Sequence, residues 1–215
     1  MPRDDKKMDV LSLNWPSLTI VAGMTQSGKT SLARWLILQG GREGSFKKIV
    51  VMCPTAGLSH DYAFIEKTAG ELTTEPTVKK VEQLLHEQKS LAARRPVLLV
   101  LDDWVGVLQV RDSKLFDQLA SSSRHYHISI MILTQDLMKL SPILRQNAST
   151  LFVTKVREHN LKAVFEMAND FPTFAQFRTF MLDNCKNYNA IRFDQNAYSH
   201  TTVFKLGLCP KFRLQ

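Results

Sequence analysis

Cysteine is scarce in this sequence, and long apolar runs are absent from it. The 215 residues include three cysteines, Cys53, Cys185 and Cys209, which lie too far apart to indicate a disulfide framework or a zinc site. A reducing intracellular setting is therefore expected. No stretch approaches the roughly 20 apolar residues that a membrane-spanning helix needs, so no transmembrane segment is predicted. The opening residues, MPRDDKKMDV, are charged and lack the apolar centre of a secretory signal.

The composition favours a globular protein with a polyanionic partner. Hydrophobic residues make up 44% of the chain, enough for one sizeable α/β domain. Lys and Arg total 28 against 20 Asp and Glu, which gives a net charge of +8. Such a charge suits a protein that acts on nucleic acid. The basic residues are spread along the chain, with Lys47-Lys48, Lys79-Lys80 and Arg94-Arg95 as the candidate contacts to a polyanion's phosphates and ordinary solvated charges as the alternative.

A phosphate-binding loop is the strongest motif. Residues 23–30, GMTQSGKT, match G-x-x-x-x-G-K-[ST]. The loop follows an apolar, β-branched run, Leu18–Val21, that suits a buried strand, and apolar residues then recur at helical spacing through Leu38. A turn that merely resembles a phosphate loop is the alternative. The strand, loop and helix in this order favour a nucleoside triphosphate site.

The loop predicts which residues hold ATP and Mg²⁺. Glycines let successive N–H groups curl around a phosphate, and the start of the helix adds its positive end. Lys29 would reach the β- and γ-phosphates, and the Thr30 hydroxyl would hold Mg²⁺. The predicted nucleotide-binding residues are Gly23, Met24, Thr25, Gln26, Ser27, Gly28, Lys29, Thr30 and Ser31.

A second landmark is the apolar run Pro96–Leu101, which ends in Asp102-Asp103. Such a run is typical of a strand buried on both faces of a parallel sheet. Ligands of open α/β sheets bind at the carboxyl ends of the strands. Asp102 would hold Mg²⁺, directly or through water, and Asp103 would orient or deprotonate the attacking water. A solvated turn that caps the next segment is the alternative.

Strands alternate with helices up to residue 155, which predicts a parallel, doubly wound sheet. The predicted strands after the first are Lys48–Met52, Pro96–Leu101, Ile128–Leu133 and Thr150–Thr154, and the predicted helices are Val78–Ala93, Ser113–Ser123 and a short one that starts at Ser141-Pro142. Residues 54–76 fit no clear pattern. Gln135 ends the Ile128 strand, where an amide can contact the γ-phosphate or the attacking water.

The pattern changes after Lys155. Two helices, Leu161–Ala168 and Phe174–Leu182, precede a β-hairpin formed by Ala190–Phe193 and Thr202–Leu206. We therefore expect a polar lead-in over residues 1–14, an ATPase core over 15–155, and a C-terminal extension over 156–215 packed on the same domain.

The order of motifs resembles a known family. GMTQSGKT, VLLVLDDW, SSRHYHISIMILTQ and LSPILRQNASTLFV follow one another over residues 15–155 as in the genome-packaging ATPases of double-jelly-roll DNA viruses. These include the poxvirus-like packaging ATPases and belong to the wider FtsK/HerA class. The resemblance implies a P-loop ATPase with a RecA/FtsK-like core and a mainly parallel sheet between helices.

The resemblance also implies roles and partners. Gln135 would be the polar sensor, and Arg124 would be the arginine finger that reaches a neighbouring subunit's nucleotide, with Arg145 as the competing candidate. A hexameric or pentameric ring would translocate double-stranded DNA into a preformed viral capsid at its portal vertex. That work would take place at the assembly site in the infected host cell, or in association with the virion. Asp103 departs from the Glu that is usual in the wider class, which we interpret as a feature of the viral branch.

Two other functions fit the same motifs. A nucleoside or polynucleotide kinase also uses a phosphate loop, although the additional strand before Asp102 and the presence of Gln135 argue against it. A nucleotide-binding assembly protein without turnover would carry the same binding residues, and measured turnover distinguishes it from an enzyme. His125 and His127 are interpreted as loop or packing residues and Trp104 as a core residue, with DNA or subunit contact as its alternative.

Overall fold

The computed structural model describes residues 15–42, 45–59, 61–65, 70–73, 77–104, 110–168, 171–195 and 200–205. The predicted lead-in over residues 1–14, Cys209 and Leu206 lie outside these ranges. Within them, every helix is too short or too polar to cross a bilayer.

The described strands form one eight-stranded sheet in the order β3-β2-β4-β5-β1-β6-β7-β8. Neighbours from β3 to β6 are parallel, whereas β7 and β8 pair in antiparallel fashion. Every residue of β1, β4 and β5 is buried, as expected for strands covered on both faces. The strands are β1 (Leu18–Ala22), β2 (Lys48–Met52), β3 (Gly70–Thr73), β4 (Val97–Asp102), β5 (Ile128–Thr134), β6 (Thr150–Val153), β7 (Asn189–Asp194) and β8 (His200–Lys205).

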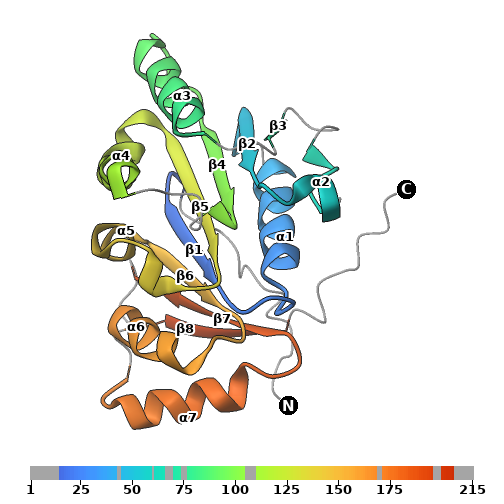
Figure 1. Ribbon diagram of the computed structural model, residues 1–215, viewed down its shortest axis with the longest axis vertical. Helices are drawn as coiled ribbons and strands as arrows, with labels where there is room; N and C mark the ends of the chain where they lie inside the picture. The colour runs from blue at the N-terminus through green and yellow to red at the C-terminus, as the bar shows by residue number, and fades with distance from the viewer. Residues whose placement is uncertain are drawn as a thin grey trace, which may run out of the picture.

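Helices cover both faces of this sheet unequally (Figure 1). Side chains alternate along each strand, so Ile20 packs into one core and Val21 into the other. The core that contains Val21 includes residues of α1 (Lys29–Arg42) and α2 (Ala56–Ser59). The core that contains Ile20 is built with α3 (Val78–Ser90), α4 (Val110–Ser122), α5 (Pro142–Asn147), α6 (Glu158–Ala168) and α7 (Phe174–Asn184). The predicted α/β class with helices on both faces is confirmed.

Several local predictions hold with shifted ends. The C-terminal hairpin is present as β7 and β8, and Ser141 caps α5, where its hydroxyl accepts from Leu144 N at 3.1 Å. The helix predicted over Val78–Ala93 ends earlier, at Ser90, because Leu91 has extended backbone with ψ 127°. The β-strand and short helix within residues 54–76 were missed. With four residues each, β3 and α2 are too short to show a hydrophobic period, and β3 lies at the sheet edge.

Candidate active site

The phosphate loop connects the central strand β1 to α1 and is held by the strands on either side. Gly23 N donates to the Thr134 carbonyl at 3.0 Å, at the end of β5, and Met24 N donates to the Lys155 carbonyl at 2.7 Å, just after β6. Gln26 and Gly28 have left-handed backbone, with φ of 59° and 92°. Two left-handed residues bend the chain sharply, which produces the curl that an anion-binding loop requires.

Gly23 is required by a close approach of the chain. A Cβ at this position would lie 1.8 Å from Thr154 Oγ1 and 2.6 Å from Ser27 Oγ. Thr154 is fully buried, its hydroxyl lies 2.7 Å from that of Ser27, and it donates to the Ala22 carbonyl at 3.2 Å. Sequence reasoning missed this role of Thr154. The available signal was a hydroxyl residue at the end of a strand predicted to neighbour the loop.

Lys29 and Thr30 open α1 and lie against the acidic pair. Lys29 is 7% exposed and its ammonium donates to the Met24 carbonyl at 2.9 Å. Burial lowers the pKa of Lys29, while Asp103 and Asp102 oppose that shift. The Thr30 hydroxyl donates to Asp102 Oδ2 at 3.5 Å. The loop and the end of β4 thus meet through these two side chains.

Asp102 is a buried carboxylate with a tyrosine partner. It is 4% exposed, and burial raises its pKa to about 6. The hydroxyl of Tyr62, which is 1% exposed, donates to Asp102 Oδ2 at 2.8 Å. Burial and the neighbouring carboxylate raise the pKa of Tyr62, so the phenol is a neutral donor. Sequence reasoning missed Tyr62 because it lies in the segment 54–76 that had no readable pattern.

Gln135 connects the phosphate loop to Asp103. Its amide oxygen accepts from Thr25 Oγ1 at 2.9 Å, and its amide nitrogen donates to Asp103 Oδ1 at 3.3 Å. Asp103 is exposed and left-handed, with φ 52°, a conformation that aspartate tolerates better than most residues. The turn directs its carboxylate toward the amide. The ends of β1, β4 and β5 therefore present an ammonium, a hydroxyl, two carboxylates and an amide to one another.

The Thr30 hydroxyl and the Asp102 carboxylate fit a hard cation. Mg²⁺ prefers oxygen ligands and takes one or two protein groups together with phosphate and water oxygens. No group of three or more His, Cys, Asp or Glu side chains in the described ranges could hold a metal ion, so His125 and His127 belong to no such group. By their oxygen ligands and their contact, Thr30 and Asp102 would hold Mg²⁺ beside a bound triphosphate.

The two candidate arginine fingers lie elsewhere. Arg124 is exposed in a one-turn 3-10 helix that precedes β5, whereas Gln135 follows β5. The seven residues of β5 separate the two by about 20 Å, at roughly 3.3 Å per residue. Arg124 therefore cannot reach the phosphate loop of its own chain. Arg145, on α5, is half-buried and donates to the Met138 sulfur at 3.5 Å.

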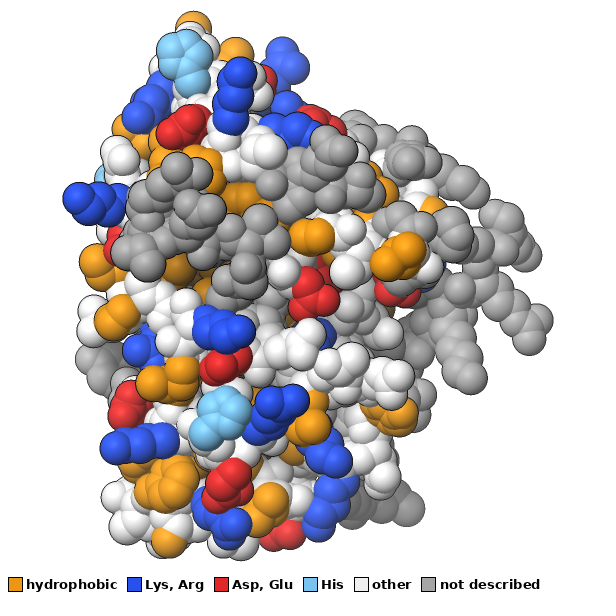
Figure 2. All heavy atoms as spheres, in the orientation of Figure 1, with side chains coloured by type: hydrophobic (Ala, Val, Ile, Leu, Met, Phe, Trp, Pro, Cys, Tyr) orange, Lys and Arg blue, Asp and Glu red, His pale blue; other side chains and the backbone are white. Residues whose placement is uncertain are grey.

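Several residues considered as contacts to DNA or to another subunit make contacts within the chain. Trp104 is 1% exposed and packs edge-on against Phe116, as the core interpretation predicted. Lys48 pairs with Glu87 at 3.2 Å, and the Arg94 guanidinium donates to the His125 carbonyl and lies over the Tyr126 ring. Figure 2 shows Lys and Arg side chains scattered over one face among acidic and apolar ones, rather than gathered in one stripe.

The chain is similar to known proteins in sequence and in fold. A family model described as "Poxvirus A32 protein" matches residues 8–173. The fold is similar to that of B204, the DNA-packaging ATPase from Sulfolobus Turreted Icosahedral Virus, with a TM-score of 0.68 and 16% identity over 90% of this chain and 98% of that chain. The B204 genome-packaging NTPase of Sulfolobus turreted icosahedral virus 2, in complex with ATP-gammaS, gives a TM-score of 0.65 and 17% identity over 90% and 98%.

A more distant similarity extends the comparison beyond viral proteins. VirB4 of Thermoanaerobacter pseudethanolicus gives a TM-score of 0.62 and 10% identity over 88% of each chain. At such identities the likeness establishes the fold. No curated protein sequence matches the chain.

Proposed function

The chain belongs to the poxvirus A32 protein family, and from this membership we propose that it is an ATPase that drives double-stranded DNA into a preformed viral capsid. The order of motifs had predicted this family. The observation that carries the proposal is the convergence of Lys29, Thr30, Asp102, Asp103 and Gln135 at the carboxyl ends of β1, β4 and β5. The B204 complex with ATP-gammaS supports ATP as the ligand.

Each group has a role that follows from its position. The loop from Gly23 to Ser31 binds the triphosphate, and Lys29 compensates charge on its β- and γ-phosphates. Mg²⁺, held by Thr30 and Asp102, would neutralise charge that develops on the phosphate oxygens. Asp103 lies in hydrogen-bond contact with Gln135. The pair orients the attacking water, and the Asp103 carboxylate accepts its proton.

The site is completed by a neighbouring subunit. Arg124 cannot complete the site of its own chain, because it lies at the opposite edge of the sheet. In a hexameric or pentameric ring, Arg124 of one subunit enters the site of the next, and Arg145 is the second candidate. An arginine finger raises the hydrolysis rate by about 10³- to 10⁵-fold, so a separated chain should be nearly inactive.

Mixing two inactive variants tests the shared site. Lys29→Ala keeps the finger and loses the loop lysine, whereas Arg124→Ala keeps the loop. Each alone should lack ATPase activity, and a mixture should regain part of it, because some interfaces then combine an intact loop with an intact finger. Lys114→Ala, which removes an exposed basic side chain on α4, is the control and should stay active.

The same ATPase assay, run over a range of protein concentrations with and without double-stranded DNA or a kinase acceptor, separates the alternatives. If the Arg124→Ala protein hydrolyses ATP at the wild-type rate, Arg124 is not the arginine finger. Arg145→Ala is then tested in the same way. Activity that is independent of protein concentration and of DNA, but responds to a nucleoside or a 5′-hydroxyl end, indicates a kinase. ATP binding without turnover in any mixture indicates an assembly protein.

We propose that residues 15–155 make the ATPase core and residues 156–215 a C-terminal extension, whose described strand β7 pairs with β6. DNA contacts are to phosphates and independent of sequence. The other partner is the capsid or its portal vertex, at the assembly site in the infected cell.

A further inference from the structure

The phosphate loop has two different sides. On the side of β5 and β4 lie Asp102, Asp103 and Gln135, which face the γ-phosphate in the proposed ATPase. On the other side lie β6 and β7. A triphosphate whose γ-phosphate faces the acidic pair must extend its nucleoside away from that pair. The nucleoside therefore points toward the β6–β7 side of the loop.

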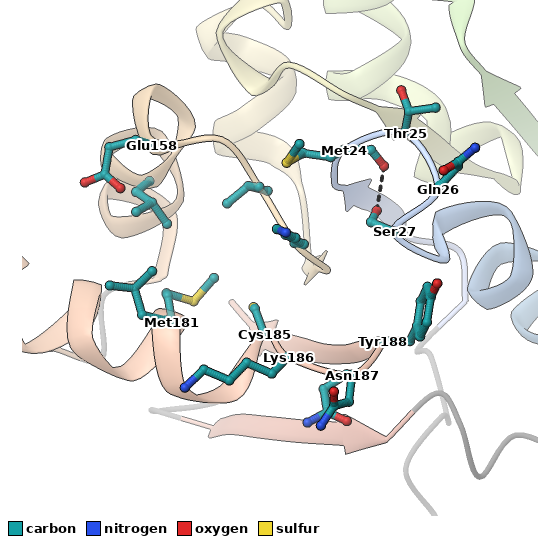
Figure 3. Close-up of a pocket in the computed structure, with 15 residues that line it drawn as sticks. Met24, Thr25, Gln26, Ser27, Glu158, Met181, Cys185, Lys186, Asn187 and Tyr188 are labelled. Atoms are coloured by element: carbon teal, nitrogen blue, oxygen red, sulfur yellow. Dashed lines mark hydrogen bonds between the residues drawn. The ribbon is translucent and has the colours of Figure 1, made fainter.

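A cavity lies there (Figure 3). Its volume is about 650 Å³, within the range of roughly 300 to 1,000 Å³ that small-molecule sites occupy. One wall is the phosphate loop from Met24 to Ser27, and the other is the connection from the end of α7 to the start of β7, residues 185–189. Leu161 and Met181 supply apolar surface between the two walls.

Tyr188 is the unusual residue of the second wall. It is 65% exposed, although an aromatic ring gains by burial. Both Tyr188 and Asn187 have left-handed backbone, with φ of 60° and 54°. A bulky residue rarely adopts this conformation, and such strain clusters at ligand sites. In Figure 3 the ring stands next to the phosphate loop, on the side of Gln26 and Ser27.

We propose that this cavity binds the purine nucleoside of ATP, with the Tyr188 ring stacked on the base. Stacking explains why an aromatic side chain is held in solvent beside the loop, and a purine offers the larger face. The amides of Asn187 and Asn189, which also line the cavity, provide donors and acceptors for the edge of the base. This assignment rests on the proposed function, since it needs a triphosphate in the loop.

Inorganic tripolyphosphate separates the two proposals, because it carries the phosphates without the nucleoside. The experiment measures the Kd of ATP and of tripolyphosphate, each with Mg²⁺, by calorimetry. Tyr188→Ala should weaken ATP about tenfold and leave tripolyphosphate unchanged. Tyr188→Phe keeps the ring and should bind both as the wild type does. Leu58→Ala, which removes an exposed apolar side chain on α2, should change neither.

A second variant tests the cavity without a change at Tyr188, in case Tyr188→Ala disturbs the fold. Leu182 lines the cavity and is 48% exposed, so Leu182→Trp adds bulk there at a tolerant position. This variant should bind ATP more weakly and tripolyphosphate with unchanged affinity, and its Tm should equal that of the wild type. An equal loss of both ligands in Tyr188→Ala, or a loss of neither in both variants, overturns the nucleoside site. If the wild type binds neither ligand and Lys29→Ala changes nothing, the proposed ATPase function fails instead.

Discussion

Replacing Asp102 by asparagine should stabilise the protein at neutral pH. The asparagine amide would keep an oxygen that accepts from Tyr62 and Thr30, and the substitution would remove a charge on a side chain that is only 4% exposed. Burying a carboxylate disfavours its ionised form, and this is why the pKa of Asp102 is raised from 3.8 to about 6. The wild type carries that unfavourable charge at pH 7, and the Asp102→Asn variant does not.

The size and pH window of the effect follow from the pKa. The difference of about two pKa units corresponds to about 3 kcal/mol, at 1.36 kcal/mol per unit. Because the folded-state pKa lies above the unfolded value, the folded chain binds more protons between about pH 4 and pH 6. The contribution of Asp102 to the free energy of unfolding of the wild type therefore falls as the pH rises through this window. The variant lacks this fall, so it gains about 3 kcal/mol above pH 6 and nothing below pH 4.

Urea unfolding at pH 4, 5, 6 and 7.5, without nucleotide and Mg²⁺, measures this difference, with tryptophan fluorescence and circular dichroism as probes. Asp103→Asn is the matched control, since Asp103 is adjacent and exposed, and asparagine tolerates its left-handed backbone. Its unfolding free energy should differ little from that of the wild type. The reasoning would be refuted if the Asp102→Asn protein were less stable than the wild type at pH 7.5, or if the difference between their free energies of unfolding did not change with pH. Either result would indicate that Lys29 compensates the charge.

Two further substitutions test the loop and its bridge. Gly23→Ala should lower the free energy of unfolding by about 1–3 kcal/mol and abolish ATP binding, because its Cβ would meet the Thr154 hydroxyl at 1.8 Å. Adding Thr154→Ala should restore part of the stability in urea unfolding, and no recovery would contradict the close approach. Gln135→Ala should lower kcat about 100-fold with little change in ATP affinity, because it orients Asp103. A steady-state assay with calorimetry checks this, and an unchanged kcat would remove Gln135 from the mechanism.

The sequence predicted the parts of the site that are local. The phosphate loop lies between its own strand and helix, so Gly23 to Thr30 could be placed without knowledge of the rest of the chain. Asp102 and Gln135 were likewise predicted at strand ends, because Asp102 follows a continuous apolar run and Gln135 follows a mostly apolar one. All these residues lie at the carboxyl edge of the sheet.

The contacts between these parts were not predictable in the same way. Tyr62 reaches Asp102 from 40 positions away, and Thr154 reaches Ser27 from 127 positions away. Such pairs depend on the strand order, which a hydrophobic pattern does not encode. The edge strand β3 was missed because Leu72 is the one apolar side chain among Gly70–Thr73. An edge strand buries less surface than a central one, so its sequence shows less alternation.

The position of β1 between β5 and β6 has a consequence for a growing chain on the ribosome. The loop residues are synthesised early, but the carbonyls of Thr134 and Lys155 that hold Gly23 and Met24 emerge more than a hundred residues later. Both flanking strands must dock before the loop has its native supports, and contacts so distant in sequence form slowly. A nascent chain that ends before β6 would thus carry the whole motif and remain unable to bind ATP. Nucleotide binding by the growing chain is therefore expected only after β5 and β6 have both paired with β1.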